Sequence, residues 1–147
     1  MRNGIRFALD LGAVRIGVAK SDPSGILASP FTVWPADSLM VELKKLLDEY
    51  TPLEIYIGLP KDLRGQDAIA ATAVRSQATL LKQHFSDVNF LLVDERMTTA
   101  EARKQLQQAG YNTKTDRQLI DAAAATVLLQ AALEAERIQG EPRGEVL

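Results

Sequence analysis

The chain has 147 residues, the size of one ordinary domain with a full hydrophobic core. Its 46% hydrophobic and 24% charged residues exclude an intrinsically disordered protein. With no cysteine and one histidine, His84, it excludes a disulfide framework and a Cys-based zinc site, and it leaves little material for a His-based triad. The net charge of −2 does not indicate a nucleic-acid binder, although acids that hold a metal can hide a local basic rim in that sum.

No internal repeat or linker divides the chain, and the N-terminus lacks the apolar region of a signal peptide. The longest mainly apolar run, Ala122–Leu129, is too short to span a bilayer. We therefore expect a cytoplasmic protein without a membrane partner. A single domain is predicted over residues 1–138, with a flexible C-terminal tail over 139–147, where Gly, Pro and Glu gather.

Three strand-like runs open the chain. Ile5–Asp10 and Arg15–Ser21 predict a hairpin that turns at Gly12, and Ile26–Trp34 predicts a third antiparallel strand. Pro30 lies inside that third run. Because proline cannot donate to a ladder, it indicates an edge strand or a bulge.

Helices and strands then alternate. Helical spacing and strand-like runs predict a helix over 39–50, a strand over 54–58, a helix over 70–85, a strand over 89–93, and helices over 98–109 and 115–137. His84 falls on the second helix as a surface residue. Helices between the later strands imply parallel crossovers. The order βββ-α-β-α-β-α thus predicts an α/β fold whose mixed five-stranded sheet carries helices on both faces.

Four acids stand where these elements end. Asp10 closes the first strand, Asp94 and Glu95 close the last strand, and Asp121 lies early in a helix whose alanines are expected to pack on the sheet. The carboxyl ends of parallel strands lie at the same end of the sheet, where ligands of α/β sheets bind. If the strand pattern persists, Asp94 and Glu95 point to opposite sides, so one of the two faces the cluster. The sequence leaves open which one.

Carboxylates without His or Cys suit a hard cation such as Mg²⁺ or Mn²⁺. Pairs of such ions about 3.5–4 Å apart stabilise the attacking and leaving oxygens of phosphodiester hydrolysis. Without a metal the same cluster repels itself. Each acid alone also has a purely structural explanation: Asp10 as a turn residue, Asp94 and Glu95 as a solvated strand end paired with Arg96, and Asp121 as an acid favoured by the helix dipole.

Four segments in order resemble one family. They are Asp10–Ala19, Ile57–Pro60, Asp94–Ala102 and Ile120–Gln130, and together they resemble the bacterial YqgF/RuvX family. The resemblance covers nearly the whole chain apart from the tail. It implies an RNase H-like fold and a nuclease described both as Holliday-junction-resolvase-like and as maturing the 5′ end of 16S ribosomal RNA.

By this resemblance, Asp10, Glu95 and Asp121 bind the metal, and Asp94 joins them in a catalytic set. Related resolvases and ribonucleases carry an acid at the end of the fourth strand. Here that strand ends in Gly58 and the two residues after it, none of them acidic. The acid pair at the fifth strand is expected to replace it.

The resemblance also implies phosphate contacts from Arg15, Lys61, Arg64 and Arg96. The favoured function is a Mg²⁺- or Mn²⁺-dependent endonuclease acting on precursor 16S ribosomal RNA, with ribosomal precursor particles as a further partner. The alternatives are a resolvase of branched DNA and a nucleic-acid-binding or ribosome-assembly factor without catalysis. Both monomer and homodimer stay open, because a two-fold junction calls for a symmetric protein.

Overall fold

Six strands form one mixed sheet in the order β3-β2-β1-β4-β5-β6. The structure, a computed structural model, describes residues 1–60, 69–97, 100–110 and 117–147. The strands are β1 (Phe7–Leu11), β2 (Arg15–Ser21), β3 (Ala28–Pro35), β4 (Ile55–Leu59), β5 (Phe90–Asp94) and β6 (Glu145–Val146). β1 runs parallel to β4 and β4 to β5, while the other pairings are antiparallel. The prediction of a mixed sheet is confirmed, with six strands rather than five.

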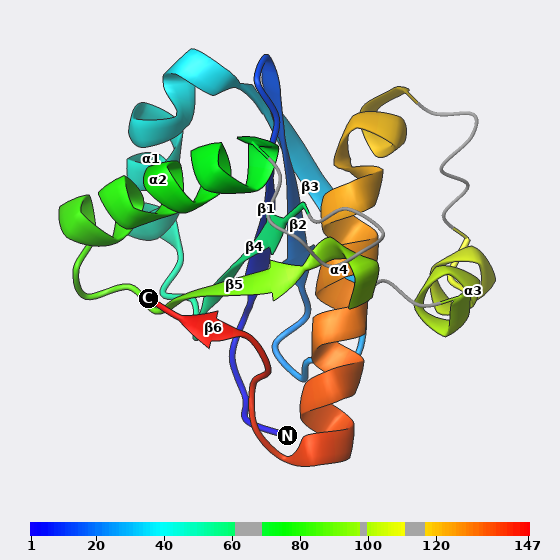
Figure 1. The fold of residues 1–147 in the computed structure, drawn as a ribbon. Coiled ribbons are helices and arrows are strands. Elements are labelled where there is room, and N and C mark those ends of the chain that lie inside the picture. Colours follow the sequence, from blue (N-terminus) through cyan, green and yellow to red (C-terminus); the bar gives the residue numbers. More distant parts are fainter. Residues whose placement is uncertain (61–68, 98–99, 111–116) are drawn as a thin grey trace.

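Helices lie on both faces of this sheet, as predicted. They are α1 (Leu39–Glu49), α2 (Ile69–His84), α3 (Ala100–Gln108) and α4 (Arg117–Gln139), with short 3-10 turns η1 (Ala36–Ser38) and η2 (Glu95–Met97). Figure 1 shows α1 and α2 together on one side of the sheet and the long α4 on the other. α3 packs against α4 rather than on the sheet.

Pro30 occupies the position that its chemistry predicts. β3 is an edge strand, so the missing N–H of the proline costs no central ladder bond. Its pairing with β2 also slips: Val18 pairs with Thr32 but Ala19 pairs with Pro30, which leaves Phe31 as the extra residue of a bulge. Both predicted readings of the proline are therefore confirmed.

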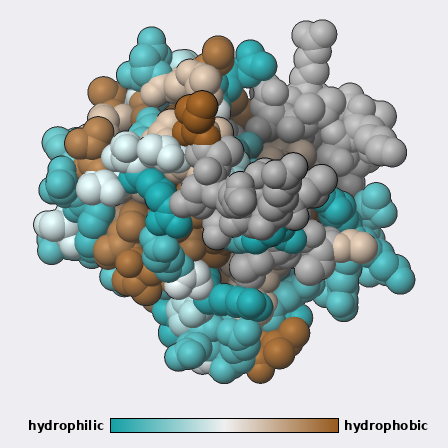
Figure 2. All heavy atoms as spheres, viewed as in Figure 1, coloured by the Kyte–Doolittle hydropathy of each residue, from teal (hydrophilic) through white to brown (hydrophobic). Residues whose placement is uncertain are grey.

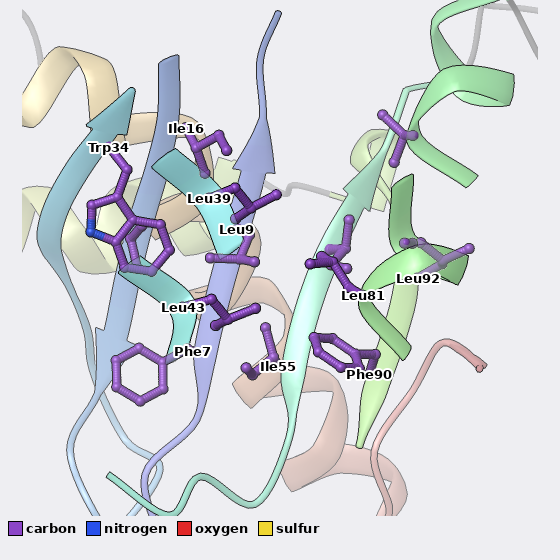
Figure 3. Packing of buried hydrophobic residues seen from close by; sticks show 14 of the residues in the cluster. Phe7, Leu9, Ile16, Trp34, Leu39, Leu43, Ile55, Leu81, Phe90 and Leu92 are labelled. Atoms are coloured by element: carbon purple, nitrogen blue, oxygen red, sulfur yellow. The ribbon is translucent and has the colours of Figure 1, made fainter. Parts of the chain in front are cut away.

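Two hydrophobic cores lie on the two faces because alternate residues of each strand point to opposite sides. The larger core, beneath α1 and α2, is built by Leu9, Ile55 and Leu92 of the three parallel strands, among others (Figure 3). The smaller core lies under α4 and includes Ala8 and Ala125. Alanines on both the sheet and the helix let the backbones approach closely, which confirms the predicted alanine face.

The C-terminal segment adds the sixth strand within the region for which the sequence predicts a flexible tail. β6 pairs antiparallel with β5, and the N–H of Leu147 donates to the carbonyl of Phe90 at 3.1 Å. Arg75 of α2 and Glu145 form an ion pair at 2.6 Å. β6 thus covers the β5 edge, whose unpaired backbone groups would otherwise be exposed. The periodicity of so short a strand could not reveal it.

A buried ion network fastens the end of the sheet opposite Asp10. Glu136 of α4 accepts hydrogen bonds from Arg6 at 3.0 Å and from Arg2 at 2.7 Å. Arg2 also pairs with Glu54, which accepts a hydrogen bond from the hydroxyl of Tyr56 at 3.1 Å. Arg6, Glu54 and Glu136 are at most 2% exposed. Charges this deeply buried are tolerated only when they are paired, so the network ties the N-terminus, β4 and α4 together.

This network predicts a loss of stability in acid. Burial alone would raise the pKa of Glu136, but the hydrogen bonds and charges of Arg2 and Arg6 outweigh it and hold the pKa below 4.5. The unfolded chain then binds a proton more readily than the folded one, so Glu136 stabilises above about pH 4.5, and this contribution disappears as the pH falls through the folded pKa. Urea midpoints measured from pH 7 to pH 3 should fall less steeply for Glu136→Gln than for the wild type. Parallel curves would contradict the prediction.

Candidate metal centre at the carboxyl ends of β1 and β5

Asp10 lies near the carboxyl end of β1, half-buried and facing α4. It pairs with Gly17 across the hairpin and follows Leu9, which pairs with Ile57 of β4. Asp10 shares a sheet face with Ala8, two residues earlier, which belongs to the core beneath α4. Burial raises the pKa of the Asp10 carboxyl because the charged form has lost part of its hydration.

Gly12 makes the hairpin after β1 possible. A Cβ at this position would lie 2.3 Å from the carbonyl oxygen of Arg15, a backbone clash that no rotamer change can relieve. The N–H of Gly12 donates to the carbonyl of Asp10 at 3.0 Å. The predicted tight turn is therefore present, and its reason is the close approach of two backbone segments.

Glu95 comes directly after β5 and reaches over β4 toward Asp10. A Cβ on Gly58 would lie 3.0 Å from Oε1 of Glu95 and 3.2 Å from its Cγ, so the Glu95 side chain lies over this glycine. Burial, and then the negative charges of Asp10 and Asp94, raise the pKa of Glu95. Glu95 thus lies within electrostatic reach of Asp10 across the sheet.

Asp94 is bound by its own neighbour Arg96. Nε of Arg96 donates to Oδ1 and Oδ2 of Asp94 at 3.1 and 3.0 Å, and its terminal nitrogen donates to Oδ2 at 2.6 Å. The backbone N–H of Arg96 donates to Oδ1 at 2.9 Å. This forked ion pair closes the turn at the end of β5 and gives Asp94 a structural partner.

The third expected acid, Asp121, belongs to the first turns of α4, and its side chain lies outside the described part of the structure. It precedes Leu128 by seven residues, which is two helix turns or about 10 Å. Leu128 packs beside Gly58, since a Cβ there would lie 3.2 Å from its Cδ2. The helix backbone that carries Asp121 therefore passes the end of the sheet at which Asp10 and Glu95 lie.

Of the four basic residues expected to contact phosphate, the structure describes two. Arg15 begins β2 as an exposed residue, next to the Leu11–Ile16 pair that closes the hairpin beside Asp10. Arg96 is 43% exposed while it pairs with Asp94. Lys61 and Arg64 lie outside the described residues.

The donors at this edge are carboxylate oxygens, the ligands that Mg²⁺ and Mn²⁺ prefer. Among the side chains that the structure describes, no group of three His, Cys, Asp or Glu is close enough to hold a metal ion. Asp10 and Glu95 would offer two carboxylates, and Mg²⁺ sites commonly use one or two carboxylates with waters and substrate phosphates. The raised pKa values of both acids mark a place where a cation would relieve unfavourable charge. The residues present fit a hard divalent cation.

A hollow of about 420 Å³ on the opposite sheet face offers no comparable chemistry. It lies between α1 and α2, and apolar side chains such as Met40 and Leu80 contribute to its lining. Figure 2, in the same view as Figure 1, shows brown apolar side chains among teal polar ones over the two helices. Its titratable lining residues are Asp37 and His84, and the exposed position predicted for His84 is confirmed. Two such groups do not make an oxygen-donor set.

Replacing Asp10 by asparagine should raise the melting temperature of the protein in EDTA at pH 7. The folded state raises the Asp10 pKa, so at neutral pH its charge destabilises the fold, and a neutral amide of the same shape removes that cost. The same variant should lose the rise in melting temperature that Mg²⁺ or Mn²⁺ gives the wild type by binding the folded state. A lower melting temperature in EDTA would contradict the proposed desolvation.

Comparisons with known proteins agree with this architecture. A protein of Streptomyces avermitilis, provisionally named a pre-16S rRNA nuclease, is 45% identical over 99% of this chain and 95% of its own length. A Streptomyces coelicolor protein of the same provisional name is 45% identical over 99% of this chain and 89% of its own. The structure of Thermus thermophilus RuvC with a Holliday junction substrate superposes with a TM-score of 0.65 at 13% identity, over 97% of this chain and 99% of that one.

RuvC has an RNase H-like fold, so this superposition supports the predicted fold class. Among the described helices, none is long and apolar enough to cross a membrane. The sequence profile of RuvX, described as a Holliday junction resolvase family, matches residues 4–135, which is nearly the whole chain. With that match and relatives of 45% identity over nearly full length, the chain belongs to the RuvX family.

Proposed function

We propose that this protein is a divalent-metal-dependent endonuclease that cuts structured nucleic acid, with the 5′ end of precursor 16S ribosomal RNA as its substrate. The observation that carries the proposal is that two half-buried acids with raised pKa values, Asp10 at the carboxyl end of β1 and Glu95 over Gly58 of β4, interact electrostatically. The provisional names of its relatives favour ribosomal RNA as the substrate class. With such a substrate the protein would act in the cytoplasm, with ribosomal precursor particles as partners.

The acids would hold the metal and the basic residues the substrate. Asp10 and Glu95, joined by Asp121 from α4, form the oxygen-donor set for one or two Mg²⁺ or Mn²⁺ ions. When bound, such ions supply a nucleophilic water and stabilise the charge that develops on the scissile phosphate. The carboxylates contribute negative charge that retains the cation, and their half-buried setting strengthens that attraction. Asp94 holds Arg96 at the end of β5 and acts on the site through that turn.

Arg15 and Arg96 stand beside these acids and would bind the phosphate backbone. Lys61 and Arg64, which follow β4 in the sequence, would extend the contact. A few such contacts suffice for a protein whose net charge is negative, because each neutralised phosphate releases counterions. Binding should therefore weaken steeply as salt rises. The protein could act as a monomer on RNA.

A second candidate substrate is a four-way DNA junction, because the family profile that matches residues 4–135 is described as a Holliday junction resolvase. Symmetric cleavage of a two-fold junction would require a homodimer that presents two such sites. A third candidate is a nucleic-acid-binding factor without catalysis. It would use the same surface as the nuclease, so only a cleavage assay separates the two.

The test is a cleavage assay of the wild-type protein on two substrates, a precursor 16S RNA fragment and a four-way DNA junction, each with Mg²⁺, Mn²⁺ or EDTA. We expect cleavage of the RNA with either metal and none in EDTA. Cleavage of the junction alone would shift the substrate to branched DNA. Binding of either substrate without cleavage in both metals would leave the assembly-factor reading and overturn the nuclease.

A further inference from the structure

The strand order separates Asp10 from Glu95 by one intervening strand. β4 lies between β1, which carries Asp10, and β5, which ends just before Glu95. Neighbouring strands are about 4.8 Å apart, so the backbones of β1 and β5 are separated by about 10 Å. A glutamate side chain is too short to cover that distance, so it can approach Asp10 only by lying over β4, and only if no side chain on β4 fills that space.

Residue 58 is the position that stands between them. Leu9 pairs with Ile57, so Asp10 lies opposite Gly58, and Gly58 in turn pairs with Val93. Alternation along β4 puts residue 58 on the same face as Tyr56, beneath α4, which is also the face of Asp10. Any side chain at 58 would therefore rise into the space that separates the two acids.

The structure fills that space with the Glu95 side chain. A Cβ at residue 58 would lie 3.0 Å from Glu95 Oε1, 3.2 Å from Glu95 Cγ and 3.2 Å from Leu128 Cδ2. All three contacts are tighter than ordinary van der Waals distance. Gly58 is not among the glycines with positive φ, so its backbone alone does not require glycine. Glycine is favoured here because Glu95 on one side and Leu128 on the other would each have to shift by a few tenths of an ångström to admit a Cβ.

We infer that Gly58 is a positioning residue for the site: by having no side chain, it leaves the space over β4 that the Glu95 carboxylate occupies, on the sheet face that carries Asp10. The Asp94–Arg96 ion pair completes the arrangement by fixing the turn from which Glu95 departs. Gly58 in β4 and Glu95 directly after β5 thus act together, because the glycine leaves the space that the glutamate occupies. The inference rests on the proposed metal site, which gives the paired carboxylates their use.

The variant Gly58→Ala should displace the Glu95 carboxylate and weaken Mn²⁺ binding about 10- to 100-fold, the loss typical of residues that orient metal ligands. Calorimetric titration of Mn²⁺ into four proteins measures this: wild type, Gly58→Ala, Glu95→Gln and the double variant. If Gly58 acts through Glu95, the alanine should cost nothing further once Glu95 is glutamine. Equal losses in both backgrounds, or wild-type affinity for Gly58→Ala, would overturn the inference.

Leu128 provides the matched control because, besides Glu95, it is the residue whose side chain a Cβ at residue 58 would contact. Leu128→Val removes the Cδ2 contact while leaving Glu95 untouched, so this single variant should bind Mn²⁺ like the wild type. If Gly58→Ala does not fold, the combination with Leu128→Val relieves one of the two clashes. That combination should fold and still bind Mn²⁺ weakly.

A crystal structure of metal-free Gly58→Ala separates this inference from the proposed function. The Glu95 carboxylate should be displaced from above residue 58, whether or not the protein cuts nucleic acid. If the wild type binds no Mn²⁺ while the carboxylate is displaced in the variant, the metal-dependent function fails and the positioning role stands. An unmoved carboxylate would end the positioning role even if the enzyme is active.

Discussion

Asp10→Asn is expected to lower Mg²⁺-dependent cleavage by about 10²–10³-fold. The substitution keeps the shape of the side chain and removes the charge that would retain the metal. Losing 3–4 kcal/mol of transition-state stabilisation, a typical order for such electrostatic contributions, corresponds to that factor. Glu95→Gln should have an effect of the same order, because the negative charge of Asp10 acts on its half-buried carboxylate. Single-turnover cleavage of the precursor RNA measures both variants.

Asp48→Asn is the control for this loss. Asp48 lies on α1, on the other sheet face, and its side chain is 69% exposed, so its charge should have no effect on cleavage. A rate for Asp10→Asn equal to that of Asp48→Asn would refute the assignment of Asp10 to the site. Because Asp10→Asn is also expected to stabilise the metal-free protein, a loss of cleavage cannot then be attributed to unfolding.

Glu136→Ala is expected to destabilise the protein by about 3–5 kcal/mol, the cost of leaving one partner of a buried ion pair uncompensated. Arg6 has no exposed surface, so its guanidinium cannot turn to water when Glu136 is removed. Alanine is a good helix former, so the effect would not come from the propensity of α4. For a chain of this length the melting temperature should fall by about 10 °C.

The exposed pair Lys44–Asp48 gives the comparison. The two side chains are 67% and 69% exposed at a separation of 3.1 Å, so Asp48→Ala should cost no more than about 0.5 kcal/mol. Urea unfolding of both variants at pH 7 measures the difference. Equal costs for Glu136→Ala and Asp48→Ala would mean that burial adds nothing to the network at the base of the sheet.

The sequence alone determined the sheet and its helices. Alternation, helical spacing and the position of Pro30 predicted the opening meander, the crossovers and the edge strand, because these patterns reflect local periodicity and single-residue chemistry. The same periodicity could not predict β6, since two residues carry no pattern and its pairing with β5 is a long-range contact. The ion network around Glu136 also had no local signal, because its charges come from segments as far apart in sequence as Arg2 and α4.

At the candidate site, the sequence predicted Asp10 and the acid pair after β5 as site residues by their places at strand ends. It left open which member of the pair approaches Asp10, because alternation says only that the two differ. Tertiary structure decided this in favour of Glu95: strand order puts β4 between the acids, and Gly58 leaves the space that Glu95 occupies. From the sequence, Gly58 was notable only because the fourth strand ends there without the expected acid. Its physical role depends on the neighbour across the sheet, which no local pattern contains.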